Sequence, residues 1–180
     1  DHLHFLGGTD FHAGVGSQAE DLLGGGHAHC GIMVYLGDNW PDSYRGTLFM
    51  NNIHGHRINN DILRRHGSGY RAAHGADLLR SADPWYVGVT LQYGPDGGVY
   101  VCDWHDTGEC HHIVNTQRHT GRIYKIFCGT PRQAYPDVAA LDNKQLVALQ
   151  SHKNDWYVRH ARRLLQERAA AGADMSETHE

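Results

Sequence analysis

Apolar and polar residues alternate in two neighbouring stretches near the middle of the chain. Residues 87–92 place two valines and a leucine at every second position, which is the period of a β-strand. Residues 95–98, Pro-Asp-Gly-Gly, supply the proline and glycine that favour a tight reversal. Residues 99–103, Val-Tyr-Val-Cys-Asp, return as a second β-rich stretch. The pattern predicts a hairpin of two strands joined by a Pro-Asp-Gly turn.

Further short strands are predicted on both sides of this hairpin. Upstream, the apolar runs predict four strands, over residues 27–36, 44–53, 54–63 and from Tyr70 onward. Residues 64–69 read as a polar hairpin loop, and residues 121–126 as a later strand. Four short strands followed by another strand–turn–strand are typical of successive blades of a β-propeller. We therefore predict a partial propeller of about two blades.

The period changes from two to 3.6 between Pro131 and Pro136. Asp142 is positioned to cap a helix over 144–149, and Asn154 or Asp155 to cap a longer helix through Ala171, stopped by Gly172. The predicted fold class is mainly β with a C-terminal α segment. The predicted domains are a propeller portion over residues 1–130 and, over residues 131–180, a helical hairpin with a disordered tail.

Charge and composition exclude several classes of function. The 180 residues have a formal net charge of −4, without the basic stripe that nucleic-acid binding requires. No apolar run approaches the length of a membrane span. No C-x-x-C-H motif is present, so we expect no covalently attached haem in this segment. The chain opens at Asp1 without methionine, and we expect it to be a portion of a longer protein.

Histidine is the unusual feature of the composition, with 16 residues, several of them two positions apart. On a strand such pairs point to one face. His54 and His56 flank a predicted strand end, where a neutral imidazole could act as a general base. Arg57 could bind a carboxylate in bidentate fashion. The alternative is that these histidines bond turn carbonyls and stabilise the junction between blades.

A second candidate group follows the central hairpin. Asp103 and Asp106 offer the hard oxygen ligands that calcium prefers, with His105 in the same candidate metal set. Trp104 offers a flat apolar wall for a ring-shaped ligand. The alternative is that Asp103 bonds backbone amides and that Arg122, in the later strand, is structural.

Several segments together carry a resemblance to a known family: residues 29–50, His54-Gly-His-Arg57, residues 94–103, residues 121–126 and residues 154–165. In order and spacing they resemble the closing blades of glucose/sorbosone dehydrogenase-like propellers. They are most similar to the large "membrane-bound dehydrogenase" proteins of planctomycete-type bacteria, in which HEAT-like helical repeats follow the propeller. The resemblance covers roughly residues 20–170.

The resemblance implies a six-bladed quinoprotein that binds pyrroloquinoline quinone and Ca²⁺ and oxidises a sugar or alcohol. It also implies a periplasmic or extracytoplasmic location, a quinone or cytochrome electron acceptor, and a cytochrome c domain elsewhere in the full-length chain. On this interpretation His54 and His56 are catalytic, and the cofactor-binding residues are His29, Arg57, Trp104 and Arg122. We expect His29, His54, His56 and Arg57 to converge with Asp103 and His105.

A function from another class stays open at this point. A propeller followed by helical repeats could instead be a non-catalytic scaffold that binds a glycan or a protein partner. Enzyme activity is therefore undecided from the sequence alone.

Overall fold

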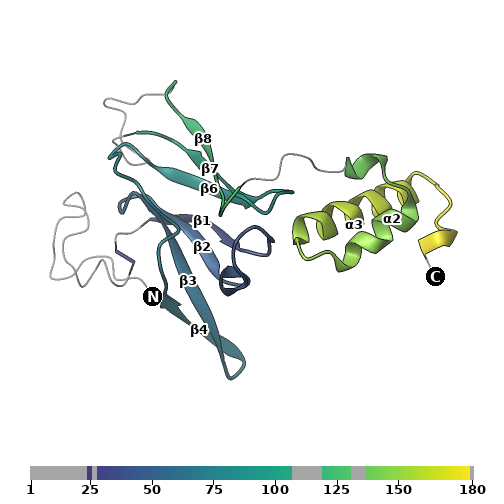
Figure 1. Ribbon diagram of the computed structural model, residues 1–180, viewed down its shortest axis with the longest axis horizontal. Coiled ribbons are helices and arrows are strands. Elements are labelled where there is room, and N and C mark those ends of the chain that lie inside the picture. Colours follow the sequence, from purple (N-terminus) through teal and green to yellow (C-terminus); the bar gives the residue numbers. More distant parts are fainter. Residues whose placement is uncertain (1–23, 26–27, 107–118, 131–136, 179–180) are drawn as a thin grey trace. The chain divides into compact units, whose positions relative to one another are not determined.

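The chain forms two β-sheets and a C-terminal pair of helices (Figure 1). The computed structural model describes residues 24–25, 28–106, 119–130 and 137–178. The mainly β fold with C-terminal helices that the sequence predicts is confirmed. Sheets without a closed barrel do not establish a propeller, so that finer prediction stays a proposal.

The first sheet is built from consecutive antiparallel strands. They are β1 (His29–Val34), β2 (Leu48–Asn52), β3 (Arg57–His66), β4 (Gly69–His74) and β5 (Leu79–Arg80). The order is β1-β2-β3-β4, and β5 also pairs with β3. One row of register partners crosses the sheet from His29 through Asn52 and Arg57 to Arg80. The neighbouring chain segments therefore bring the predicted residues His29 and Arg57 to the same end of the sheet.

The second sheet has the strand order β6-β7-β8. Its strands are β6 (Gly88–Tyr93), β7 (Val99–Asp103) and β8 (Arg122–Ile126). The predicted turn between β6 and β7 is closed by a bond from the Gly94 amide to the Gly98 carbonyl at 2.9 Å. Gly97 has a φ of 72° there, which glycine adopts without steric cost.

One local prediction was wrong. Residues 64–69 do not form a polar loop, because β3 continues to His66 and β4 begins at Gly69. The two strands pair from Asp61 with His74 to His66 with Gly69, so only two residues turn the chain. Gly67 has the positive φ, 60°, that such a tight hairpin turn needs.

By contact, the chain divides into two compact units. The first consists of residues 1–35, 46–92 and 99–126. Its buried apolar residues include Tyr35 and Phe49, whose rings stack at 5.4 Å, together with Ile58, Val99 and Val101.

The second unit contains the helices and two segments that come from the β-rich region, residues 36–45 and 93–98. Its helical elements are η3 (Asp42–Tyr44), η4 (Val138–Ala140), α2 (Asn143–Ala148), η5 (Leu149–Ser151), α3 (Asp155–Ala170) and η6 (Ser176–Thr178). The side chains of Asp142 and Gln145 form a capping box at the start of α2. Val138, Leu146, Tyr157 and Ala161 are buried between the helices. None of the described helices is long and apolar enough to cross a membrane.

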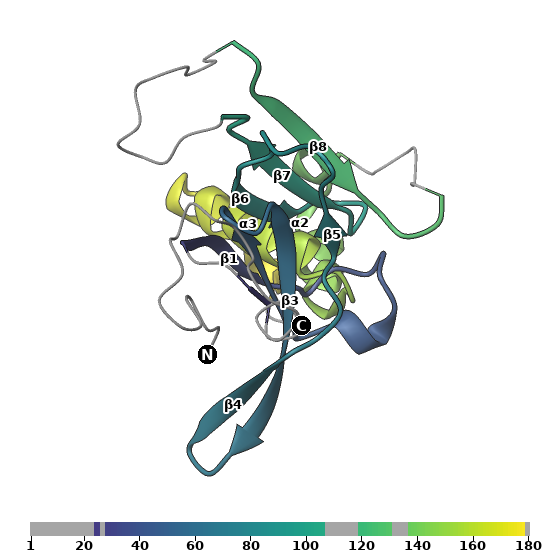
Figure 2. The ribbon, with the colours of Figure 1, turned by 90° about the vertical axis from the view of Figure 1, so that its left-hand side faces the viewer.

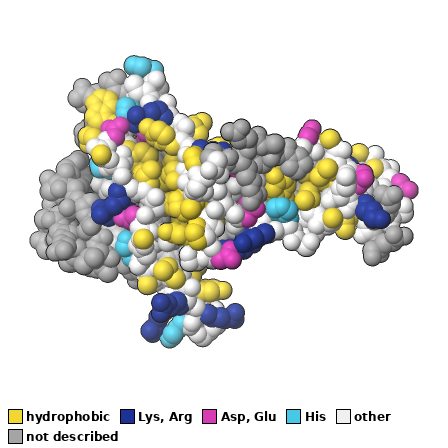
Figure 3. Space-filling view, viewed as in Figure 1, with side chains coloured by type: hydrophobic (Ala, Val, Ile, Leu, Met, Phe, Trp, Pro, Cys, Tyr) yellow, Lys and Arg dark blue, Asp and Glu magenta, His cyan; other side chains and the backbone are white. Residues whose placement is uncertain are grey.

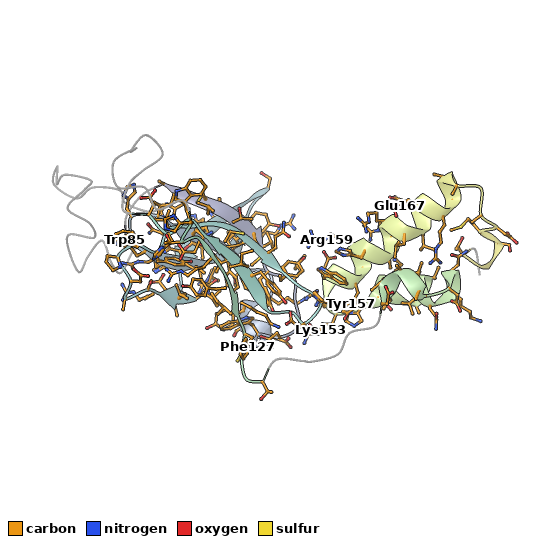
Figure 4. All side chains as sticks on the ribbon, turned by 90° about the horizontal axis from the view of Figure 1, so that it is seen from above. Trp85, Phe127, Lys153, Tyr157, Arg159 and Glu167 are labelled. Atoms are coloured by element: carbon orange, nitrogen blue, oxygen red, sulfur yellow. The ribbon has the colours of Figure 1, made fainter. Side chains whose placement is uncertain are left out.

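Asn154 connects α3 to the hairpin turn within this second unit. Its Oδ1 accepts from the Trp156 amide as the N-cap of α3. Its Nδ2 donates to the carbonyls of Gly94 at 3.0 Å and Pro95 at 3.2 Å. One turn along α3, the Arg159 guanidinium lies 5.1 Å from the ring centre of Tyr93 (Figure 4). A single buried amide therefore fixes both the turn and the start of the helix.

Candidate functional site

Asp103 lies at the end of β7 and binds four donors. Its Oδ1 accepts from the Val87 amide at 2.8 Å and the His105 amide at 2.9 Å. Its Oδ2 accepts from Nε and Nη2 of Arg122 at 3.2 and 3.0 Å. The side chain is fully buried, and a buried carboxylate is tolerated when it is paired and hydrogen-bonded in this way.

Arg122 also binds a second carboxylate. Its Nη2 lies 2.8 Å from Oδ2 of Asp83, and the two side chains are 37% and 38% exposed. The hydrogen bond from Arg122 lowers the pKa of Asp83, with a further contribution from the Trp85 amide. Asp83 in turn raises the pKa of Arg122. The ion pair is therefore stabilised in its charged form and is partly exposed to solvent.

His105 completes this group, which we name the Asp103 cluster and define as Asp83, Asp103, His105, Thr120 and Arg122. Its Nδ1 lies 2.8 Å from Oγ1 of Thr120, and its Nε2 lies 3.4 Å from Oδ2 of Asp83. The Trp85 ring lies beside it, with the two ring centroids 5.4 Å apart. The two ring nitrogens are thus held in distinct environments, as in sites that orient a proton.

The candidate metal ligands do not form a calcium site in this arrangement. Both carboxylate oxygens of Asp103 already accept hydrogen bonds: Oδ1 from the two backbone amides and Oδ2 from the Arg122 cation. Asp106 is buried and accepts from Trp104 Nε1 at 3.3 Å. Among the residues that the structure describes, no group of three or more His, Cys, Asp or Glu side chains is arranged so that it could hold a metal ion. A cation such as Ca²⁺ would have to displace Arg122 from Asp103.

Trp104 and the Asp103 cluster lie on opposite faces of the second sheet. On β7, Val99, Val101 and Asp103 are buried, whereas Cys102 and the residue that directly follows the strand, Trp104, are exposed, which continues the alternation of a strand. Trp104 is 61% exposed. It therefore does not form a wall against the side chains of Asp103 and Arg122.

The first sheet supplies the other predicted residues. His56 Nδ1 lies 2.7 Å from the carbonyl of Tyr86, and Asp103 binds the amide of the next residue, Val87. The side chains of His56 and Asp103 thus bond to the backbone of two consecutive residues, Tyr86 and Val87. His29 lies on β1, and His54 lies in the turn between β2 and β3.

Arg57 belongs to a separate buried group that the sequence did not reveal. Its Nη1 lies 3.2 Å from Oδ2 of Asp77, and its side chain is 4% exposed. Asp77 also accepts from Asn59 Nδ2 at 3.0 Å and lies 3.3 Å from His74 Nε2. We name Arg57, Asn59, Asp61, His74, Asp77 and Arg80 the Asp77 cluster.

The Asp77 cluster neutralises the cation that we predicted to bind a ligand carboxylate. The buried Arg57 guanidinium has its counter-ion within the fold, so these described residues do not fit a quinone carboxylate. The sequence did contain a pattern that indicates this group. In residues 57–61, Arg-Ile-Asn-Asn-Asp, every second position is Arg, Asn or Asp. On a strand this pattern puts polar side chains on one face, but it does not show that the face is buried.

Tyr86 joins the two sheets inside the first unit. Its hydroxyl donates to Oδ1 of Asn51 at 3.4 Å. Burial, and then the Asp103 charge, raise the pKa of Tyr86 well above its usual range. A Cβ on Gly88 would lie 2.3 Å from Asn51 Oδ1 and 2.6 Å from the Tyr86 hydroxyl. The contact therefore requires glycine at position 88.

Comparison with known proteins gives one match. The model of the domain of unknown function DUF7133 matches residues 10–128, more than half of the chain. No curated protein matches, and no solved structure matches.

Proposed function

This chain belongs to the DUF7133 family, and we propose that it forms part of a quinoprotein-type dehydrogenase propeller in which it binds the sugar or alcohol substrate. Support comes from the resemblance of its strand segments, in order and spacing, to glucose/sorbosone dehydrogenase-like propellers. The paired antiparallel sheets are compatible with successive blades. On this proposal the protein acts outside the cytoplasm and passes electrons to a quinone or cytochrome acceptor.

The observation that carries the proposal is the half-exposed Asp83–Arg122 ion pair beside aromatic rings. Trp85 lies on one side against His105, and Arg122 lies 5.2 Å from the ring centre of Tyr124. A carboxylate and a guanidinium side by side can accept from and donate to neighbouring hydroxyl groups. Aromatic faces suit the apolar C–H surface of a sugar ring. A few oriented polar groups among rings are typical of small-molecule sites.

His105 is the residue best placed to accept a proton at this surface. Its Nε2 faces Asp83, and its Nδ1 is held by Thr120. A hydroxyl bound to Asp83 would lie within reach of Nε2, as a general base requires. His56 also has its Nδ1 held, by the Tyr86 carbonyl, but it is not one of the residues that make up the Asp103 cluster.

When bound, pyrroloquinoline quinone would supply the hydride acceptor. Arg57, predicted to bind the quinone, and Asp103, predicted to bind Ca²⁺, do not fit those roles, since Arg57 is neutralised by Asp77 and Asp103 by Arg122. The proposal therefore assigns substrate binding to this chain and assigns the quinone and Ca²⁺ to other residues of the full-length protein.

The same observation favours a second candidate, a non-catalytic scaffold that binds a glycan. Arg57 is paired with Asp77, and Asp103 is paired with Arg122. These two ion pairs remove two of the predicted cofactor contacts but leave the Asp83–Arg122 surface intact. The two candidates share the sugar surface and differ only in electron transfer.

The test combines binding and turnover in the full-length protein. Binding of a panel of monosaccharides and sugar alcohols is measured by calorimetry, and dye reduction is measured after loading with pyrroloquinoline quinone and Ca²⁺. Asp83→Asn should weaken binding about tenfold, because the charged pair is lost. The matched control is Tyr70→Ala, which removes an exposed ring from β4 and should leave binding unchanged.

Each outcome distinguishes the candidates. Binding with dye reduction supports the dehydrogenase, whereas binding without reduction in the loaded protein supports the scaffold. Absence of binding to every sugar, or equal losses in Asp83→Asn and Tyr70→Ala, would overturn both.

A further inference from the structure

The distal half of the β3–β4 hairpin projects from the first sheet. β2 pairs with β3 only over residues 57–61, whereas β4 pairs over 61–66. Beyond Asp61 the hairpin is therefore a two-stranded ribbon, and Figure 2 shows it extending past the other strands. Residues 64–73 are all exposed. A ribbon without a packed face gains little stability from burial.

This ribbon carries a concentrated positive charge. Arg64, Arg65, His66 and Arg71 lie within it, and residues 62–76 contain no Asp or Glu. Figure 3 shows the basic side chains gathered at this end of the molecule. The whole chain has a net charge of −4, so the ribbon is locally opposite in sign to the protein that carries it.

Two of the arginines face each other directly. Arg64 and Arg71 are register partners on β3 and β4, a position in which like charges destabilise the pair of strands. Within the described part of the chain, neither guanidinium forms an ion pair or hydrogen bond. This arrangement costs stability in the free protein, and an external oxyanion between the two guanidinium groups would remove the cost.

Exposed apolar side chains accompany the arginines on both faces of the ribbon. Strand alternation places Ile62, which is 38% exposed, on the face of Arg64 and Arg71. Tyr70, which is 65% exposed, is the register partner of Arg65 on the opposite face. Arginine and tyrosine are the residues most enriched in protein–protein hot spots. The ribbon is therefore suited to insertion between two walls of a partner.

We infer that the β3–β4 ribbon, residues 62–73, is a docking element for a protein with an acidic groove. Asp and Glu carboxylates of that groove bind the Arg64–Arg71 pair and Arg65, while Ile62 and Tyr70, on opposite faces of the ribbon, contact apolar side chains of its two walls. Guanidinium groups bind carboxylates in a bidentate manner that lysine cannot reproduce. The inference is independent of the sugar surface, which lies on the second sheet.

The observations favour a protein partner over the other polyanions. A membrane-inserting hairpin needs apolar residues at its tip, whereas here Ile62 lies near the sheet and the arginines lie near the turn. Nucleic-acid binding usually requires a broad basic surface, and the positive charge here is confined to one ribbon of an acidic chain.

A simpler role is protection of an edge strand, since β4 is at the edge of its sheet and charged residues discourage edge-to-edge pairing. Protection accounts for Arg71 on β4. It does not account for Arg64 on the neighbouring strand, which faces Arg71 and raises the repulsion.

The experiment measures binding of fluorescent poly-L-glutamate of about 20 residues, long enough to span the ribbon, to the full chain at physiological salt. Arg64→Gln/Arg71→Gln should weaken binding about tenfold, and Arg64→Lys/Arg71→Lys severalfold, because the bidentate contacts are lost. The matched control is Arg162→Gln/Arg163→Gln on α3, which removes the same charge from another exposed surface. It should change the affinity less than about twofold. Tyr70→Ala keeps the charge and should weaken binding less than the arginine variants do, because poly-L-glutamate offers the Tyr70 ring only methylene groups.

Parallel measurements with phosphatidylserine vesicles and with duplex RNA and DNA decide between polyanions. The inference is overturned if either binds more tightly than poly-L-glutamate, if the α3 control loses as much affinity as the ribbon variant, or if poly-L-glutamate does not bind. The last result would leave edge protection as the role of the arginines. Circular dichroism verifies that the exposed substitutions preserve the fold.

Discussion

Arg122 directs both Nε and Nη2 to one oxygen of Asp103, at 3.2 and 3.0 Å. The other oxygen of Asp103 holds the amides of Val87 and His105. The carboxylate therefore joins three chain segments that are separate in sequence.

Asp103→Asn should destabilise the protein by about 2 kcal/mol, because a buried charge-assisted network loses its charge while the shape is kept. Urea denaturation measures this loss: the midpoint should fall, while the slope of the unfolding free energy against urea concentration should not change. Asp42→Asn is the control, since the Asp42 pair with Lys153 is exposed on both sides and should contribute little. Equal losses in the two variants would contradict the role assigned to Asp103.

The Asp83 carboxyl group, followed by NMR, should have a pKa below the ordinary value of about 3.9, because Arg122 stabilises its charged form. A lowered folded-state pKa means that this stabilisation is present above the unfolded-state value and is lost as the pH falls through the folded-state value. Arg122→Gln should raise the Asp83 titration midpoint towards the ordinary value. An unshifted midpoint in the wild-type protein would show that the pair does not form in solution.

Gly88→Ala should destabilise the protein by about 1–3 kcal/mol, as overpacked cores do, because the new methyl group meets Asn51 and the Tyr86 hydroxyl. Gly69→Ala is the matched control on an exposed strand, where the nearest atom to a Cβ is 4.0 Å away. Thermal melts of both variants test the prediction. It is wrong if Gly88→Ala melts no lower than Gly69→Ala.

Asp77→Ala should cost about 3–5 kcal/mol, because it leaves the buried Arg57 guanidinium without its counter-ion. The double variant Arg57→Met/Asp77→Ala should cost less than the sum of the single variants, since neither charge of the ion pair is left without its partner. A double-mutant cycle measures that difference. Strict additivity would indicate that the two residues do not depend on each other.

Strands β6 and β7 could be predicted because their apolar residues alternate and a Pro-Asp-Gly turn separates them. The helices could be predicted from their caps and their period. The hairpin was predicted, but the strand pairing at its distal end was missed, because charged residues such as Arg64 and Arg65 give no apolar period, and pairing with β4 rather than burial keeps them in a strand.

The candidate site was predictable only in part. Asp103 and Arg122 were singled out, and the alternative reading, in which Asp103 bonds backbone amides, describes its Oδ1. The partner of Arg57 was not predictable, because Asp77 lies 20 residues further along the chain and returns through an irregular segment. A pattern of period two identifies which residues share a face, but it does not identify which of two faces the fold covers.

The two hairpin turns differ in how they could change during evolution. The Gly67–Ser68 turn is surrounded by solvent, and a side chain on Gly67 would meet nothing, so this turn can lengthen or diversify. The turn after β6 is held by Asn154, and a side chain on Gly97 would lie 2.4 Å from the Asn39 amide nitrogen. Residues 36–45, 93–98 and the start of α3 are therefore expected to vary together among relatives, as one inherited unit.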